Sequence, residues 1–256
     1  MSSRTWFGSR YLENGITFTT PAQSTWVPVR KLSEIESRIS QEDMLAGLGY
    51  SYARASFLCH NVHNSTHEAI LRVYKQVPNI GTEADEPEDR QLQATRRIHQ
   101  EVDTMERLTE EHECAYVPAW LGSKIEEQGD HDIVPHGYIN YILWEKVPGV
   151  HLCNPDENFV LFWSLPRQER DRIRTAFVIT YQKLYTIGIC PVLGGCNNLI
   201  WDAQQDRIYV IGLDDVAECN AFGNVTFLEW GLATAPDGCP WGDEDFDDSS
   251  MEGWKL

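Results

Sequence analysis

One stretch of the chain, residues 188–216, holds polar residues in an order that suits the binding of a metal ion. Asn198 precedes a short apolar run that ends at Trp201, and Asp214 and Asp215 follow a second apolar run. A polar turn separates the two runs, which predicts a pair of short strands. Amide and carboxylate oxygens are typical ligands of magnesium. Asn198, Asp214 and Asp215 are therefore candidate metal ligands by residue type alone.

Two charged residues earlier in the chain have the types needed to hold a phosphate. Lys75 ends the segment AILRVYKQ, which alternates in polarity as a half-buried strand does. Glu101 lies on a stretch with helical apolar spacing. A carboxylate on a neighbouring helix can hold a lysine at the phosphates of a nucleotide. The structural alternatives are a solvated lysine at a strand end and an ordinary exposed glutamate. The strand face that the alternation predicts consists of Ala69, Leu71, Val73 and the stem of Lys75.

The rest of the chain supplies the elements that must position these residues. Ser33 and Glu36 form a candidate capping box, which predicts a short helix. Gly188 follows an amphipathic segment, as a glycine does at the C-terminal end of a helix. The expected helices are residues 31–41, 90–111 and 171–187, and the expected strand segments are 46–62, 69–76, 114–122 and 138–150.

The order of three segments, LRVYKQVP, EVDTMERL and YILWEKVPG, resembles the protein-kinase-like superfamily, which includes the aminoglycoside and choline phosphotransferases. With SFLCHNV before them, they are similar to uncharacterised fungal kinase-like proteins. The resemblance covers residues 53–216. It implies an α+β, two-lobed fold whose N-lobe is an antiparallel sheet plus a helix and whose helical C-lobe is reduced. The implied domains are an N-terminal arm with a short helix (1–45), an N-lobe (46–147), and a C-lobe with an acidic tail (148–256).

The resemblance also implies roles for individual residues. Lys75 and Glu101 would bind the nucleotide phosphates, and Glu145 to Val147 would form the hinge that pairs with adenine. The implied cofactors are ATP and Mg²⁺, with Asn198 as a metal ligand.

Three family positions carry unsuitable residues when the chain is aligned on Asn198. The catalytic aspartate falls on Leu193, the histidine on Pro191 and the metal-binding aspartate on Gly212. Leu193 cannot accept a proton, and losing such a group costs on the order of 10² to 10⁴ in rate. The apolar loop formed by Leu193, Gly194, Gly195 and Cys196 would line the floor of the cleft.

These losses predict a catalytically degenerate kinase-like protein with a pseudokinase-type binding or scaffold role and weak nucleotide binding. One alternative is a repurposed enzyme that isomerises or cyclises an apolar small molecule in specialised metabolism. Another is an atypical small-molecule phosphotransferase in which Asp214 or Asp215 is a displaced metal ligand. The expected partner is a small molecule or a protein.

Composition and charge exclude some classes of binding partner and indicate the cellular compartment of the chain. The net charge of -18 argues against nucleic acid and anionic membranes, because both are polyanions. No apolar run is long enough to span a bilayer, and no apolar leader segment is evident. The seven cysteines are odd in number and form no CxxC pair, which predicts free thiols and a cytoplasmic location. We expect Cys196 to be a buried structural cysteine rather than a nucleophile.

Three histidines, His60, His63 and His67, lie close together in sequence and could form a metal cluster. The turn formers Asn61 and Asn64 favour a polar hairpin tip instead.

Overall fold

The computed structural model describes residues 5–12, 14–110, 115–153, 160–192, 194–218, 220–243 and 245–256. The chain is a mixed α+β protein that divides into two compact units. The first comprises Met1–Asp103 and Ala119–Lys146, and the second comprises Thr104–Pro118 and Val147–Leu256. None of the helices in the described ranges has the length and apolar character needed to cross a membrane.

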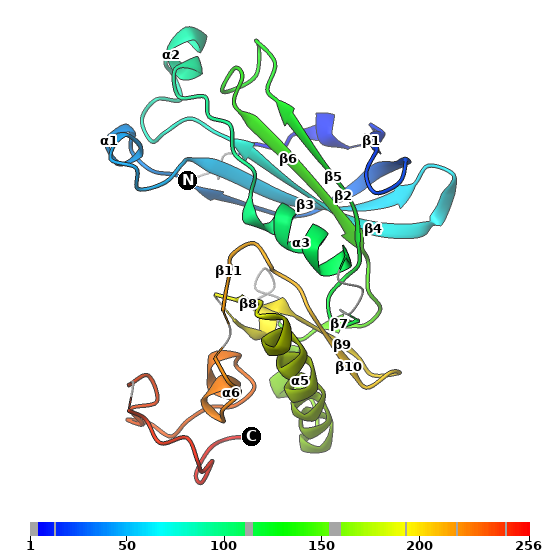
Figure 1. Ribbon diagram of the computed structural model, residues 1–256, viewed down its shortest axis with the longest axis vertical. Helices are drawn as coiled ribbons and strands as arrows, with labels where there is room; N and C mark the ends of the chain where they lie inside the picture. The colour runs from blue at the N-terminus through cyan, green and yellow to red at the C-terminus, as the bar shows by residue number, and fades with distance from the viewer. Residues whose placement is uncertain are drawn as a thin grey trace. The chain divides into compact units, whose positions relative to one another are not determined.

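The first unit is built on a six-stranded antiparallel sheet with the strand order β1-β2-β3-β4-β6-β5 (Figure 1). Consecutive strands from β1 to β4 pair with one another, whereas β6 lies between β4 and β5. The connection from β4 to β5 carries two helices, α2 (Pro87–Gln91) and α3 (Gln100–Glu110). The strands are β1 (Ile16–Phe18), β2 (Ser24–Ser37), β3 (Tyr52–Asn61), β4 (Asn64–Gln76), β5 (Trp120–Glu127) and β6 (Tyr138–Glu145).

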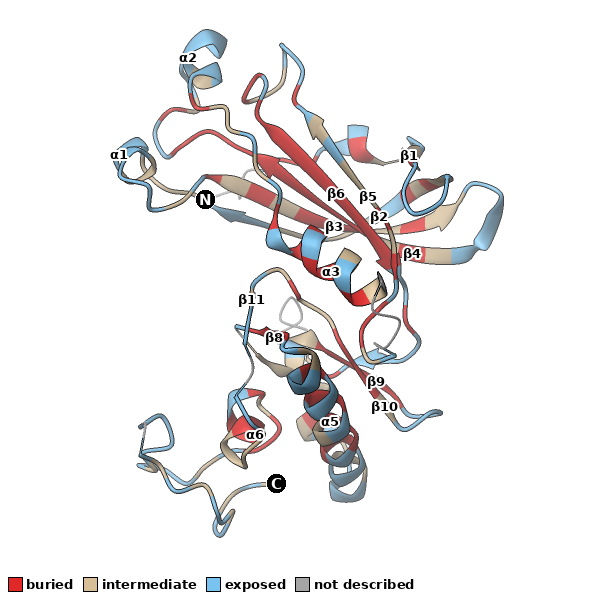
Figure 2. Ribbon diagram, viewed as in Figure 1, coloured by how far each residue is buried: buried red, intermediate tan, exposed pale blue. Residues whose placement is uncertain are grey.

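Strand β4 has two different faces, as its alternating side chains predict. The face formed by Ala69, Leu71, Val73 and Lys75 is confirmed, and all four residues are at most 2% exposed. It packs against an aromatic cluster from the N-terminal segment, which includes Trp6, Phe7 and Tyr11. Strands β4 and β6 are buried along most of their length (Figure 2).

The second unit contains a long helix, α5 (Arg167–Ile187), and small sheets. Gly188 ends α5 in the left-handed conformation, with φ +69°, which confirms the predicted helix end. Strands β9 (Leu199–Asp202) and β10 (Arg207–Val210) form the predicted hairpin. The remaining elements are β7 (Val150–His151), α4 (Leu161–Ser164), β8 (Cys190–Pro191), the 3₁₀ turn η3 (Cys196–Asn198), β11 (Val216–Ala217) and α6 (Val225–Glu229).

Several predicted boundaries are wrong because sheet pairing overrides local signals. Residues 31–37 belong to β2, which pairs with β3 along its length, so the expected helix over 31–41 does not form. Ser40 instead caps α1 (Gln41–Leu45) by accepting a hydrogen bond from the amide of Asp43. In the described residues, the helix expected over 90–111 forms only at the end of α2 and in α3, and the strand expected over 114–122 begins only at Trp120, as β5.

The histidine-rich segment is the turn of the β3–β4 hairpin, as its turn formers favour. In the described part of the chain, no group of three histidine, cysteine or acidic residues is placed to hold a metal ion.

The C-terminal tail is hydrogen-bonded to other parts of the second unit. Asp248 accepts a hydrogen bond from the amide of Val225 at 2.9 Å, at the start of α6. Lys255 pairs with Thr234, and the Leu256 carbonyl accepts a hydrogen bond from Arg170. The tail is therefore part of the second unit's structure.

Candidate functional site

A buried ion pair links β4 to helix α3 in the first unit. Arg72 Nη1 lies 2.6 Å from Glu101 Oε1, and the Glu101 side chain is 2% exposed. The Tyr74 hydroxyl donates to the other carboxylate oxygen of Glu101 at 2.7 Å. The Arg72 guanidinium lies over the ring of Trp144, 4.8 Å from its centre. Both oxygens of the carboxylate are thus bonded, which is what a buried charge requires.

Further aromatic and polar groups lie next to this ion pair, on the same face of the sheet. His99 stacks on Tyr74 with ring centres 3.9 Å apart, and its backbone amide donates to Asn140 Oδ1 at 2.9 Å. The His99 ring also lies within hydrogen-bonding distance of the Tyr138 hydroxyl, at 3.3 Å. Burial raises the pKa of Tyr138 above its ordinary value, so its hydroxyl stays protonated. We call Arg72, Tyr74, His99, Glu101, Tyr138 and Asn140 the α3-face cluster.

Lys75 lies on the opposite face of β4 and does not form the expected ion pair with Glu101. Its ammonium donates to the Trp6 carbonyl at 2.9 Å and lies 5.4 Å and 5.5 Å from the ring centres of Phe7 and Tyr11. Burial lowers its pKa to about 8. The predicted pairing of Lys75 with Glu101 is therefore wrong. Side chains an odd number of positions apart on a strand point to opposite faces, so Arg72 faces Glu101 and Lys75 points away from it. Arg72, three residues earlier, has the partner that was assigned to Lys75.

The expected hinge residues, Glu145 and Val147, already take part in other contacts of the fold. The backbone amide of Glu145, at the end of β6, donates to the Ala119 carbonyl at 2.8 Å, so it is not available to an adenine ring. Val147 is 6% exposed and packs in the second unit with Ile200 and Tyr209.

Asn198 in the second unit directly faces a glycine. Ile211 donates its amide to the Asn198 carbonyl at 2.8 Å, which extends the β9–β10 pairing and brings Gly212 beside Asn198. Gly212 has φ +81°, and a Cβ added there would lie 2.5 Å from Asn198 Oδ1. A carboxylate at this position would strain the backbone and require the Asn198 side chain to move.

The two aspartates of the predicted metal site follow in a turn. Asp215 is exposed, and its carbonyl accepts a hydrogen bond from the amide of Val192 at 2.9 Å. Asp214 is half-buried. The metal-binding position of the family falls on Gly212, which has no side chain to bind a metal. The magnesium site that the resemblance implies therefore lacks an acid at its family position, and Asn198, Asp214 and Asp215 stay predicted ligands.

The loop before Asn198 is held by packing and by a disulfide. Leu193 lies outside the described residues. A Cβ added at Gly194 would lie 2.6 Å from the Trp230 ring, whereas one at Gly195 would meet only the Asn197 side chain. Cys196 is bonded to Cys153, with Cα atoms 5.3 Å apart. This bond closes a loop with a sequence separation of 43, which stabilises a fold by roughly 4 kcal/mol in the chain-entropy account.

The prediction of free thiols is wrong for the paired cysteines. Cys153 and Cys196 are joined, and Cys190 is also disulfide-bonded. Cys59 and Cys239 are free. Because the sulfur of Cys196 is engaged, it cannot act as a nucleophile in this form. The cytoplasmic location depended on free thiols and stays a prediction without that support.

Sequence comparison finds no protein-family model and no curated protein that matches this chain. The site therefore has to be interpreted from its own geometry. Arg72 is the residue that sequence reasoning missed. The signal was present, because the alternation that buries Lys75 with Leu71 and Val73 places Arg72 on the other face.

Proposed function

We propose that this chain is a catalytically degenerate kinase-like protein with a pseudokinase-type binding or scaffold role and weak nucleotide binding. The observation that carries the proposal is the contact between Gly212 and Asn198. In a phosphotransferase an acid at this position would hold the metal that neutralises the transferring phosphate. Here the position is a glycine with φ +81°, a backbone conformation in which any other residue would be strained.

Two features of the first unit support the kinase-like part of the proposal. The connection between β4 and β5 contains a helix, and β6 lies between those two strands. A basic residue on β4 and an acid on that helix form a buried pair, Arg72 and Glu101. This arrangement suits a sheet that once held a nucleotide phosphate, with arginine in place of lysine.

Arg72 is the group that we expect to attract a phosphate. A guanidinium stays charged under all ordinary conditions and presents several donors in a planar fork, which matches phosphate oxygens. Lys75 is enclosed on the opposite face by the N-terminal aromatic cluster. The two residues therefore form a matched pair for testing nucleotide binding.

The experiment is a thermal-shift titration with ATP, with and without magnesium, on wild type, Arg72→Lys and Lys75→Met. Each variant is compared with its own ligand-free melting temperature. At ATP near 100 times the dissociation constant, binding adds about 2.7 kcal/mol, which is roughly 2–4 °C for a chain of this size. We expect a shift that does not need magnesium, decreases in Arg72→Lys and persists in Lys75→Met.

Three results would change the proposal. Magnesium-dependent transfer of phosphate from ATP to an acceptor, with repeated turnover, would show an active phosphotransferase and overturn it. A shift that disappears in Lys75→Met but not in Arg72→Lys would place the nucleotide on the wrong face of the sheet. No shift at millimolar ATP would remove nucleotide binding and leave only the scaffold role.

A further inference from the structure

Four large apolar side chains are exposed at one end of the first unit. Leu45 and Leu48 lie on and just after α1, Ile80 follows β4, and Leu92 ends α2. Their exposed fractions are 76%, 72%, 57% and 83%. Clustered exposed apolar groups mark interaction sites more often than isolated ones do. We call these four residues the end patch.

The segments that carry the end patch are at the end of the sheet where β3 begins and β4 ends, beside α1 and α2 (Figure 1). Ile80 donates its amide to the Ile39 carbonyl at 2.9 Å, which joins the segment after β4 to the segment before α1. Asn79 also contacts the sulfur of Met44 in α1, at 3.2 Å. Backbone and side-chain contacts thus connect the two segments directly.

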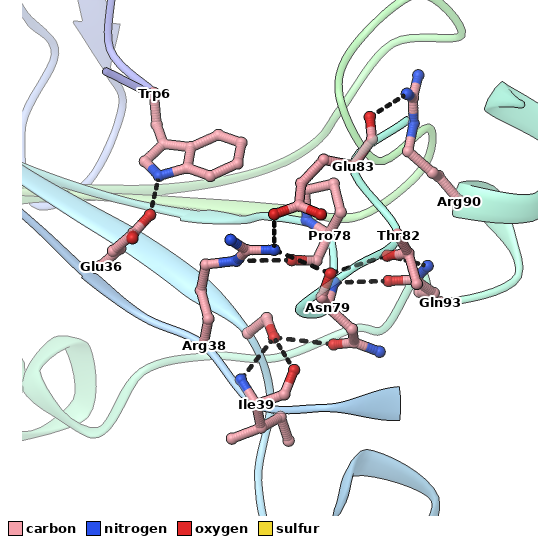
Figure 3. Close-up of polar contacts among 11 residues, drawn as sticks. Trp6, Glu36, Arg38, Ile39, Pro78, Asn79, Thr82, Glu83, Arg90 and Gln93 are labelled. Atoms are coloured by element: carbon pink, nitrogen blue, oxygen red, sulfur yellow. Dashed lines mark hydrogen bonds and ion pairs between the residues drawn. The ribbon is translucent and has the colours of Figure 1, made fainter. Parts of the chain in front are cut away.

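A buried polar network makes this end of the unit rigid (Figure 3). Arg38 donates to the carbonyls of Pro78 and Asn79 at 3.0 Å and 2.9 Å and pairs with Glu83 at 2.6 Å. The Asn79 amide donates to the Gln93 side chain, which in turn donates to Thr82. Asn79 and Gln93 are 1% and 4% exposed. Fully bonded buried networks hold a single arrangement, so the end patch is presented by a fixed base.

The surroundings of the end patch are strongly acidic. Residues 38–50 and 78–97 contain seven acidic side chains and four arginines. All four arginines have partners within the first unit. Arg38 binds Glu83, and Arg90 donates to the carbonyls of Glu83 and Asp85. Arg96 pairs with Glu127 at 3.2 Å, and Arg97 lies over the ring of Tyr50 at 5.2 Å. The remaining acids produce a negative electrostatic potential around the end patch. They include Glu42, Glu86, Glu88 and Asp89.

We propose that the end patch binds a basic amphipathic segment of a protein partner. Such a segment has apolar side chains on one side and lysine or arginine on the other, so it complements both the leucines and the surrounding acids. A second copy of this chain would bring like charges together, and an anionic membrane or nucleic acid would be repelled. The inference does not depend on nucleotide binding, and its test contains no nucleotide.

The probe is a fluorescein-labelled 18-residue peptide of leucine and lysine with helical amphipathic spacing, with a scrambled peptide of the same composition beside it. Binding is measured by fluorescence anisotropy on the full chain. We expect Leu45→Ser with Leu48→Ser to weaken binding at least 10-fold. The matched control is Val29→Ser with Ile125→Ser, which removes two exposed apolar side chains from the sheet, 44% and 52% exposed in the native chain. The control should change affinity less than 2-fold.

A second pair of variants tests the acids. Glu86→Gln with Glu88→Gln removes two charges beside the end patch, and Glu126→Gln with Glu127→Gln removes two from β5. Because both pairs change the net charge equally, a nonspecific attraction would respond equally to them. We expect at least a 3-fold loss of affinity for the first pair, less than a 1.5-fold loss for the second, and weaker binding of wild type at high salt.

Four outcomes would overturn the proposal. The patch and control variants could lose affinity equally, or the scrambled peptide could bind as tightly as the amphipathic one. Self-association of wild type that Leu45→Ser with Leu48→Ser abolishes, measured by sedimentation velocity, would show that the occupant is a second copy. Cosedimentation with phosphatidylcholine vesicles that the same variant abolishes would assign the patch to a membrane. Circular dichroism of each variant verifies that it is folded.

Discussion

Arg72 and Lys75 are two basic residues on one strand whose surroundings differ completely. Arg72 faces α3, where the Glu101 carboxylate and the Trp144 ring hold its guanidinium. Lys75 faces the N-terminal aromatic cluster, where a backbone carbonyl and two rings contact its ammonium. They are 8% and 2% exposed, so burial alone does not separate them.

The difference lies in the partner that each charge receives. A carboxylate within hydrogen-bonding distance offsets the loss of water around a buried cation, whereas a carbonyl and aromatic rings offset it less. Burial accordingly lowers the pKa of Lys75 to about 8, close to neutral solution. The α3 face therefore keeps a permanent cation, and the opposite face holds one that can lose its proton.

The largest expected effect comes from removing the carboxylate that Arg72 contacts. Glu101→Ala leaves a buried guanidinium without its counter-ion, which should lower the free energy of unfolding by about 3–5 kcal/mol in urea denaturation. Asp103→Ala on the same helix is the control, because its side chain is exposed, and it should cost less than about 1 kcal/mol. The double variant Arg72→Met with Glu101→Met should recover part of the loss. A cost for Glu101→Ala no larger than that for Asp103→Ala would contradict the comparison.

The pH dependence of the free energy of unfolding tests the surroundings of Lys75. Its pKa is about 8 in the folded chain and near the ordinary 10.5 when unfolded, so the unfolded state binds more protons between those values. Wild type should therefore gain about 2 kcal/mol relative to Lys75→Met between pH 7 and 9.5. The measurement is urea denaturation of both proteins at each pH.

Lys124→Met provides the control for this titration, because the Lys124 side chain is 37% exposed. The difference between that variant and wild type should not change over the same range. A constant difference for Lys75→Met as well would show that the Lys75 ammonium titrates normally despite its burial.

The smallest effect concerns the second hydrogen bond to Glu101. Tyr74→Phe removes the hydroxyl that donates at 2.7 Å and keeps the ring that stacks on His99. We expect a loss of about 1.5 kcal/mol in the free energy of unfolding, because a buried carboxylate oxygen loses its donor. Tyr185→Phe, at an exposed tyrosine of α5, should change stability by less than about 0.5 kcal/mol. Equal effects of the two variants would mean that Tyr74 contributes only through its ring.

Local patterns predicted the parts of the fold in which sequence neighbours decide the structure. The amphipathic helix ending at Gly188, the β9–β10 hairpin and the buried face of β4 are as predicted. The helix predicted over residues 31–41 failed because a local capping signal competed with a long pairing between β2 and β3. Such a pairing depends on residues far along the chain, which no local window contains.

The sequence by itself determined the chemistry available to the candidate site. It supplied two basic residues on one strand, an acid on the helix α3, an asparagine before a hairpin and a glycine after it. Only the tertiary structure decided that Glu101 binds Arg72 and that Cys196 bonds to Cys153. A strand's alternation shows which residues share a face but does not identify the element that covers each face. That choice follows from packing between distant segments, which places Glu101 on one side of the sheet and the N-terminal aromatics on the other.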